Sequence, residues 1–380
     1  MRAGASLLLL LAVLAVSSCG ASHRAETKAA TTRKTPAEPH YTYLALTSRS
    51  GKILRLSNLA VSSAVADGRD GWYVNGAIGL ARLLPSGKLD SSWGSPESRK
   101  LGCSVGCRLV KFGSRLYVAG QRSETVPGTG GEARVSVVEA FDAGTGARLW
   151  VGPSPSQNVY ALAASSTRVY VGGAFTSVGN MKRHGLAALD AETGRLLDWS
   201  GPRISFNPPT SAAIFALTLD GSRLYLGGTF LSIGGKRQFY LAALNPATGA
   251  LLSWKPPQAV SGAYYPMQIL VTRGQLIIPG YDGFFAASLR TGRKPSWLAE
   301  IRGSAGTVTV DGSLLYLGAN IDQSLSSVDG ARRNNLAAID LATGRATSWA
   351  PDLAPYVDVG AIVPSGGRVL VVGSFTDSIG

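Results

Sequence analysis

A repeated sequence pattern constrains the fold of this chain of 380 residues more than any other feature. Each unit has an apolar strand, a Leu-Ala-Ala-Leu strand, a short turn and a terminal Trp, most clearly in residues 169–199 and 224–254. Repetition of this kind is typical of folds built from stacked supersecondary units. Tryptophans end six units at intervals of 43 to 57 residues: Trp93, Trp150, Trp199, Trp254, Trp297 and Trp349.

The residues within each unit predict short β-strands. Runs such as residues 160–164 and 215–219 are short, apolar or alternating, and lack helical periodicity. The turn Asp190-x-x-Thr193-Gly194 is typical of a hairpin, because Asp accepts bonds from the turn's own amides and Gly adopts positive φ. Four strands and two hairpins per unit match one blade of a β-propeller. The same turn recurs in residues 142–146, 245–249 and 340–344.

The two ends of the chain complement each other. Residues 368–375 begin a seventh unit, and residues 43–54 align with the missing half, represented by residues 186–197. We therefore expect residues 41–380 to form an all-β, seven-bladed β-propeller closed by N- and C-terminal strands that share the last blade. Such closure removes open sheet edges. The alternative is a truncated gene model.

The N-terminal residues 1–19 are typical of an export signal. A basic residue and a short apolar stretch precede small residues, and the stretch is too short to span a membrane. Residues 16–19, Val-Ser-Ser-Cys, resemble a bacterial lipobox, which implies that Cys19 is the lipid attachment site. A plain secretory signal with an incidental Cys is the alternative. We expect an extracytoplasmic protein anchored by lipid to a bacterial membrane.

Residues 20–40 contain no Leu, Ile, Phe or Val, and we interpret them as a flexible tether. In the alternative interpretation, their basic residues contact anionic headgroups. The whole chain has a net charge of +14, which favours anionic partners. Nucleic acid is not expected, because the basic residues are scattered and the predicted compartment does not fit.

The amino-acid sequence of the repeat resembles that of a known family. Tyr170-Val171-Gly172-Gly173, followed by residues 186–199, resembles the quinoprotein-like (PQQ-binding-like) β-propeller repeats of bacterial secreted proteins, over about residues 41–380. Kelch repeats, the second choice, usually have a shorter spacing from Asp to Trp. The resemblance implies that four of the tryptophans pack between neighbouring blades: Trp150, Trp199, Trp254 and Trp349.

Quinone-dependent dehydrogenases on the resembled scaffold carry an adjacent Cys-Cys pair and a calcium site. Three residues separate Cys103 from Cys107, so we expect no cofactor; a quinone-binding remnant is a further alternative. In an exported domain these two cysteines are expected to form a small loop disulfide. A metal site would need more ligands, and a redox-active pair is the alternative.

The sequence offers few candidate catalysts. His184 is the only histidine after residue 40, so triads and metal sites that depend on histidine lack the residues they need. No metal site is expected. Paired carboxylates could act as acid and base. The acids outside the repeated turns are the better candidates: Asp282, Asp322, Asp329 and Asp358.

Aromatic and charged residues outside the repeat consensus predict a binding face. Loops between blades open onto one face of a propeller, where such residues could contact a glycan or an extended peptide. Ordinary packing between blades is the alternative. The predicted face consists of Tyr264, Tyr265, Tyr281, Asp282, Arg332, Arg333 and Tyr356.

Two functional hypotheses follow. The first is a monomeric, non-catalytic binding or assembly platform for protein or anionic glycan partners of the cell envelope. The second is an envelope lyase or hydrolase that uses a carboxylate, Tyr or Arg in the propeller funnel.

Overall fold

In the residues that it describes, the computed structural model consists almost entirely of antiparallel β-sheets. Residues 1–38 are a separate unit from residues 39–380. The predicted signal peptide, Cys19 and the tether lie outside the described residues. The described residues are 41–47, 51–57, 59, 61–102, 107–125, 131–206, 213–254, 266–280, 283–291, 293–295, 300–319, 324–351 and 358–374.

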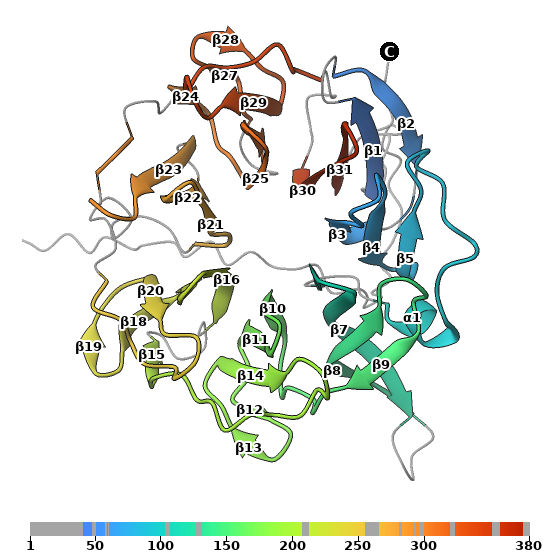
Figure 1. Cartoon of the computed structure of the whole chain (residues 1–380), viewed down its shortest axis with the longest axis vertical. Coiled ribbons are helices and arrows are strands. Elements are labelled where there is room, and N and C mark those ends of the chain that lie inside the picture. Colours follow the sequence, from blue (N-terminus) through green and yellow to red (C-terminus); the bar gives the residue numbers. More distant parts are fainter. Residues whose placement is uncertain are drawn as a thin grey trace, which may run out of the picture. The chain divides into compact units, whose positions relative to one another are not determined.

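Each main sheet begins with a strand that lies near the centre of Figure 1. These innermost strands are β3 (Val61–Ala66), β6 (Arg108–Phe112), β10 (Val159–Ala164), β16 (Ile214–Asp220), β21 (Leu270–Thr272), β25 (Thr307–Asp311) and β30 (Asp358–Ser365). Each contacts the innermost strands of two neighbouring sheets, in this order and from β30 back to β3.

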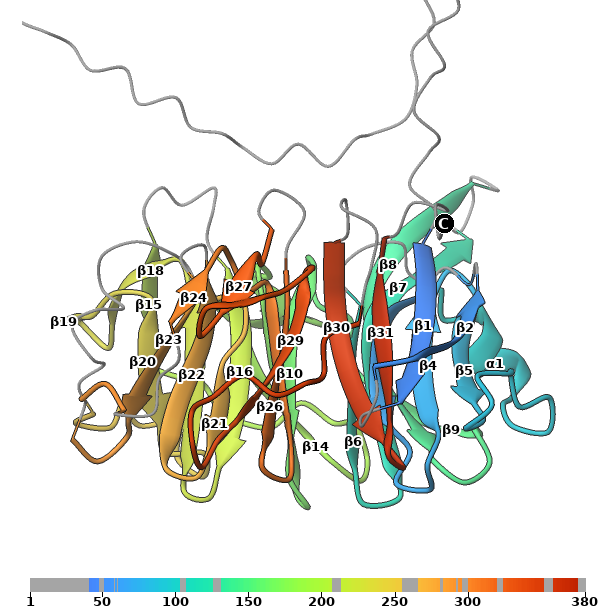
Figure 2. The ribbon, with the colours of Figure 1, turned by 90° about the horizontal axis from the view of Figure 1, so that it is seen from above.

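The middle strands of these sheets carry the apolar Tyr-Val-Gly-Gly pattern or a variant of it. They are β4 (Trp72–Gly76), β7 (Arg115–Thr125), β11 (Arg168–Gly173), β17 (Arg223–Gly228), β22 (Gln275–Gly280), β26 (Leu314–Gly318) and β31 (Arg368–Ser374). The third strands are β5 (Gly79–Leu83), β8 (Glu132–Asp142), β14 (Leu186–Asp190), β20 (Leu241–Leu244), β23 (Gly283–Ser288), β29 (Leu336–Asp340) and β1 (Tyr41–Thr47). In Figure 2, β7 and β8 extend beyond the ends of their neighbours.

The strand pairing predicted between the two chain ends is present. The last sheet has the order β2-β1-β31-β30, with β2 spanning Ile53–Ser57. Leu44 of β1 pairs with Val371 of β31 in an antiparallel register. Backbone hydrogen bonds therefore connect the N-terminal strands to the C-terminal strands of the described chain.

The outer parts of the sheets differ from the predicted four-strand unit. A full fourth strand is present in the last sheet, as β2, and in the sheet of β6, as β9 (Arg148–Val151). In four other sheets the segment after the turn forms a single bridge, such as Leu189 to Leu196. Packing holds this segment in place of a continued ladder, since Leu196 and Leu197 contact two different core clusters.

Short hairpins after the middle strands add small sheets that the sequence pattern did not predict. They consist of β12 (Ser177–Val178) with β13 (Met181–Lys182), β15 (Ile204–Phe206) with β18 (Phe230–Ile233) and β19 (Lys236–Arg237), and β24 (Ile301–Arg302) with β27 (Ser327–Val328) and β28 (Ala331–Arg332). The one short helix, within the described residues, is α1 (Pro96–Lys100), which Ser95 caps. No described helix is long and apolar enough to cross a membrane.

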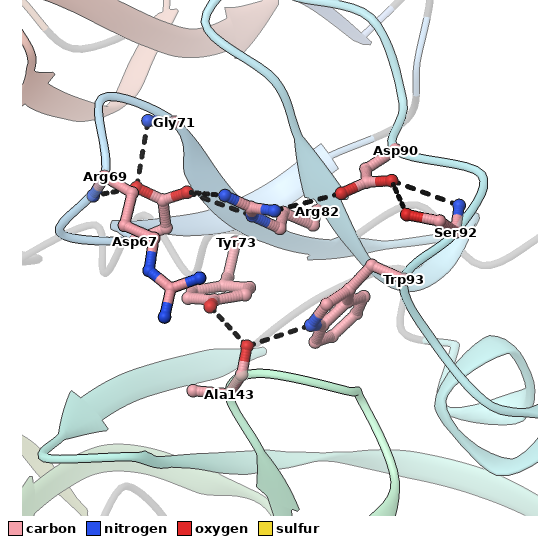
Figure 3. A network of polar contacts seen from close by, with 9 residues as sticks. All are labelled: Asp67, Arg69, Gly71, Tyr73, Arg82, Asp90, Ser92, Trp93 and Ala143. Carbon is pink, nitrogen blue, oxygen red and sulfur yellow. Dashed lines mark hydrogen bonds and ion pairs between the residues drawn. The ribbon is translucent and has the colours of Figure 1, made fainter.

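A Tyr-Trp pair joins each of several sheets to the next. The rings of Tyr73 and Trp93 lie 5.3 Å apart, and both side chains donate hydrogen bonds to the carbonyl of Ala143 in the next sheet's turn (Figure 3). Tyr117 and Trp150 make the same contacts with the carbonyl of Ala191. These tryptophans pack between neighbouring sheets, as the family resemblance implied for Trp150.

A buried ion-pair network stabilises the first sheet. Arg82 lies between Asp67, at 2.7 Å, and Asp90, at 3.0 Å (Figure 3). Burial by itself raises the pKa of the Asp67 carboxyl, but hydrogen bonds from the Arg69 and Gly71 amides and from Arg82 outweigh it. The pKa of Asp67 is therefore lowered from its ordinary value, and the carboxyl is ionised at neutral pH. None of its residues lines the cavities described below, so we interpret the network as structural.

Candidate functional site

The innermost strands surround a central cavity of about 440 Å³. One residue near the start of each strand lies at an equivalent position in the repeat and lines this cavity. These residues are Ser62, Cys107, Tyr160, Phe215, Met267, Gly306 and Gly360.

β-Bulges explain why several of these side chains lie at the cavity. In β10 the register shifts between Val159 and Ala161, which leaves Tyr160 as the extra residue. In β16 the shift between Ile214 and Ala216 leaves Phe215. A bulge leaves one residue outside the regular ladder and changes the direction of its side chain. Equivalent shifts occur at Ser62 and Gly360.

The cavity lining is apolar on one side. The rings of Tyr160 and Phe215 lie 5.3 Å apart on adjacent innermost strands. Met267, in the next repeat, is 57% exposed. At the equivalent positions in the following repeats, Gly306 and Gly360 have no side chain. The lining therefore combines an aromatic and thioether surface with exposed backbone.

Arg108 is the one charged side chain among the described residues that line this cavity. Its Nε donates to the carbonyl of Tyr160, and its Nη1 donates to the carbonyl of Cys107 at 2.9 Å. Burial lowers the pKa of the Arg108 guanidinium from its ordinary value. An arginine nevertheless stays protonated in proteins, so the cavity carries a positive charge.

Polar groups beside Cys107 lack partners within the described structure. Ser63 lines the cavity, and its hydroxyl is buried without a hydrogen-bond partner among the described residues. Asn75 is the cross-strand neighbour of Ser63, and its Nδ2 is also buried without a hydrogen-bond partner among the described residues. Cys107 is disulfide-bonded, and its predicted partner, Cys103, lies outside the described residues. That pairing stays a prediction.

A second cavity, of about 570 Å³, adjoins the first and has a more polar lining. Gln121 donates to Asn158 Oδ1 at 2.9 Å, and the Asn158 amide lies 3.4 Å from the Tyr160 hydroxyl. Arg134, on the extended strand β8, also lines it. Tyr160 belongs to both linings, so the two cavities meet at this residue.

Most of the predicted binding face lies outside the described residues, namely Tyr264, Tyr265, Tyr281, Asp282 and Tyr356. Arg332 is exposed on β28. The guanidinium of Arg333 donates to two backbone carbonyls, those of Arg332 and Thr347, at 2.7 Å each. Arg183 makes the equivalent contacts in an earlier repeat, so this arginine position stabilises the repeat itself.

The described candidate acids do not line either cavity. Asp329 is exposed in the turn between β27 and β28, and Asp358 begins β30. Asp322, like Asp282, lies outside the described residues. Within the part of the chain that the structure describes, no three His, Cys, Asp or Glu side chains lie close enough together to hold a metal ion.

Sequence reasoning missed the residues that line the central cavity, above all Arg108, Tyr160, Phe215 and Met267. A signal was present in the repeats. When the repeats are aligned on their middle strands, the position that Tyr160 occupies holds residues as different as Phe, Met, Cys, Ser and Gly. A position free to vary within a repeated core is one that does not face that core.

Comparison with known proteins identifies the repeat. The sequence model of one family, described as "Outer membrane protein assembly factor BamB", matches residues 59–351. No curated protein sequence matches the chain.

Solved structures show a similar fold at low sequence identity. A chain of the "Mitotic Checkpoint Complex" is 11% identical with a TM-score of 0.51, covering 93% of this chain and 100% of that one. The "computationally designed Ika8 protein" is 13% identical with a TM-score of 0.50, covering 85% and 87%. The "Neurospora crassa Pan2 WD40 domain" is 12% identical with a TM-score of 0.46, covering 90% and 87%. At these identities the first two support the all-β fold alone.

Proposed function

Because this chain belongs to the PQQ-like repeat family described as outer membrane protein assembly factor BamB, we propose that it is an extracytoplasmic β-propeller that binds or helps to assemble partners of the cell envelope without catalysing a reaction. The partners are proteins or anionic glycans, and the chain works as a monomer. The proposed binding face includes the central cavity and its polar neighbour, together with the loop residues that the sequence predicts.

Seven blades and closure of the propeller are part of this proposal. Its support is the cyclic order of contacts among the innermost strands, from β3 through to β30 and back to β3. The pairing of β1 with β31 also supports it, because backbone hydrogen bonds then join strands from the two ends of the chain in one last sheet.

A lipid anchor at Cys19 is also part of this proposal. Its support is the lipobox-like segment of residues 16–19, together with the outer-membrane description of the matched family. Lipidated protein should partition with the membrane fraction, because its acyl chains insert into the bilayer. The variant Cys19→Ala should be found in the soluble extracytoplasmic fraction. Equal membrane association of both proteins would contradict the anchor.

The observation that carries the binding function is the junction of the two cavities at Tyr160. One cavity has exposed Met267 and the paired rings of Tyr160 and Phe215, and the other has the Gln121-Asn158 pair. Concave surfaces that combine apolar side chains with a few placed polar groups are typical of binding sites. Contiguous exposed apolar surface also marks interaction sites.

Capture of partners from native envelope tests this function. Wild-type protein should retain a reproducible set of envelope components, and Met267→Ala should reduce their recovery several-fold. The matched control is Met181→Ala, since Met181 is similarly exposed, at 53%, but lies on β13 and lines neither cavity. Equal losses in the two variants would remove the cavity from the binding function.

The enzyme hypothesis is tested separately with polyanionic glycans. Turnover by wild-type protein that disappears in Asp282→Asn or Asp322→Asn would replace the binding platform with a lyase or hydrolase.

A further inference from the structure

The central cavity contains a positive charge that no described carboxylate neutralises. Arg108 contacts two backbone carbonyls, and no Asp or Glu among the described residues forms an ion pair with it. A cation removed from water without a paired anion is costly to the folded protein. A negatively charged ligand in the cavity would offset that cost.

The free donors at Arg108 suit a carboxylate. The guanidinium presents its N–H groups as a flat fork that matches the two oxygens of a carboxylate. Backbone contacts hold Nε and Nη1, whereas Nη2 makes no hydrogen bond to a described residue.

An apolar surface lies directly beside this charge. The carbonyl that accepts from Arg108 Nε belongs to Tyr160, whose ring packs against Phe215, and exposed Met267 follows in the next repeat. If Arg108 bound the anionic end of a ligand, the group next to that end would therefore contact the aromatic rings and the thioether.

We propose that the central cavity binds an organic carboxylate, which pairs with Arg108 while an adjoining apolar group packs against Tyr160, Phe215 and Met267. The cavity volume of about 440 Å³ is suited to a small molecule or to the end of one polypeptide chain. This goes beyond the proposed binding of envelope partners. The test uses the purified full-length chain without envelope, so either proposal can fail while the other stands.

A pair of probes tests the charge requirement without changing the protein. Phenylacetate and phenylacetamide share the ring and differ in the anionic group. Calorimetric titration should show phenylacetate binding at least about tenfold more tightly, because a charge-assisted hydrogen bond is stronger than a neutral one. Equal affinities, or no measurable binding of phenylacetate, would overturn the proposal.

Two substitutions then locate the site. Arg108→Lys keeps the charge but loses the planar fork, and should weaken phenylacetate binding about tenfold. Its control is Arg183→Lys, which removes the same kind of backbone contact at a residue that lines neither cavity and should leave affinity unchanged. Met267→Ala should weaken binding several-fold relative to Met181→Ala. Because Met267 is exposed, this pair remains informative if Arg108→Lys fails to fold.

The same chemistry could come from a free metabolite or from the C-terminus of a polypeptide. N-acetylglycylphenylalanine and its C-terminal amide distinguish these sources. Binding of the free acid at least as tight as that of phenylacetate, with loss in the amide, assigns the ligand to a chain end. Binding of phenylacetate alone assigns it to a small metabolite. If both the dipeptide amide and phenylacetamide bound as well as the acids, Arg108 would not be recognising a carboxylate.

Discussion

Single polar residues decide much of the local stability, and Asp67 is the clearest example. Its side chain is fully buried, accepts hydrogen bonds from two backbone amides and forms an ion pair with Arg82. A lone surface pair such as Arg302 with Glu300 is different, since both side chains are 76% exposed. Exposed pairs contribute little, whereas loss of one partner from a buried pair leaves an uncompensated charge.

We expect Asp67→Asn to lower the free energy of unfolding by about 3 kcal/mol at neutral pH. The folded-state pKa of Asp67 is lowered from 3.8, so its stabilising effect is present above that value and is lost as the pH falls through the folded-state pKa. Urea unfolding at about pH 5 and about pH 3 measures this. The wild type should lose more stability than Asp67→Asn on acidification, and Glu300→Gln should match the wild type. A parallel loss in wild type and Asp67→Asn would assign the acid sensitivity to other groups.

Two tryptophans separate packing from hydrogen bonding. Trp93 and Trp199 are 5% and 4% exposed, but only the first donates from Nε1 to a described carbonyl, that of Ala143 at 2.9 Å. Trp199 Nε1 is buried without a described partner. We expect Trp93→Phe to cost about 1 kcal/mol more than Trp199→Phe, since only the former breaks a hydrogen bond. Equal shifts of the urea midpoint would mean that ring packing alone is responsible.

At the level of the element, the repeated turn has two roles: it closes a hairpin, and it contacts the preceding sheet. Asp190 accepts hydrogen bonds from the amides of Glu192 and Thr193, which closes the turn. Gly194 then has φ of 72°, and its α-carbon lies against the ring of Trp150 from the preceding sheet. The turn therefore ends a hairpin and also forms a contact surface for the neighbouring blade.

The variants Gly194→Ala and Gly221→Ala distinguish these two roles. Both glycines have positive φ, but a Cβ at Gly194 would lie 2.5 Å from the Trp150 ring, whereas a Cβ at Gly221 meets nothing within 4 Å. Gly221→Ala should cost about 1 kcal/mol from backbone strain alone. Gly194→Ala should cost roughly 1–3 kcal/mol more, because the aromatic packing must shift. Thermal unfolding followed by circular dichroism measures both, and equal costs would show that the ring moves freely.

Elements also show where prediction from sequence stopped. The Asp-x-x-Thr-Gly turns and the strands beside them follow from local chemistry, since the side chain of Asp190 bonds within its own turn. The fourth strands did not follow, because residues such as Leu196 form a single bridge and pack against a cluster shared with the preceding sheet, which no local pattern encodes. The short hairpin of β12 and β13 also did not follow from the sequence pattern.

For the molecule as a whole, the joint between the chain ends is decisive. β1 lies between β2 and β31, so its backbone is hydrogen-bonded on both sides. Without β1 and β2, the edge of β31 would be open, and the cluster that contains Trp349 would lose Ile53, which packs against it. An exposed edge strand is a template for aggregation.

Two truncations test this joint. A chain that begins at Pro39 should unfold at the same urea concentration as the full chain, because residues 1–38 form a separate unit. A chain that begins at Asn58 lacks β1 and β2, and should unfold at lower urea and aggregate. Light scattering and urea unfolding measure the difference. If the shorter chain were equally stable and monomeric, the shared last sheet would be unimportant for stability.

The sequence by itself determined the repeat, the strand and turn chemistry within each unit, and the complementarity of the two chain ends. All of these depend on residues close together or on a pattern that recurs. Only the tertiary structure decided what the innermost strands surround. Arg108, Tyr160, Phe215 and Met267 lie in different repeats, and no local pattern relates them. They meet because the sheets stand side by side and the bulged strands direct single residues to a common cavity.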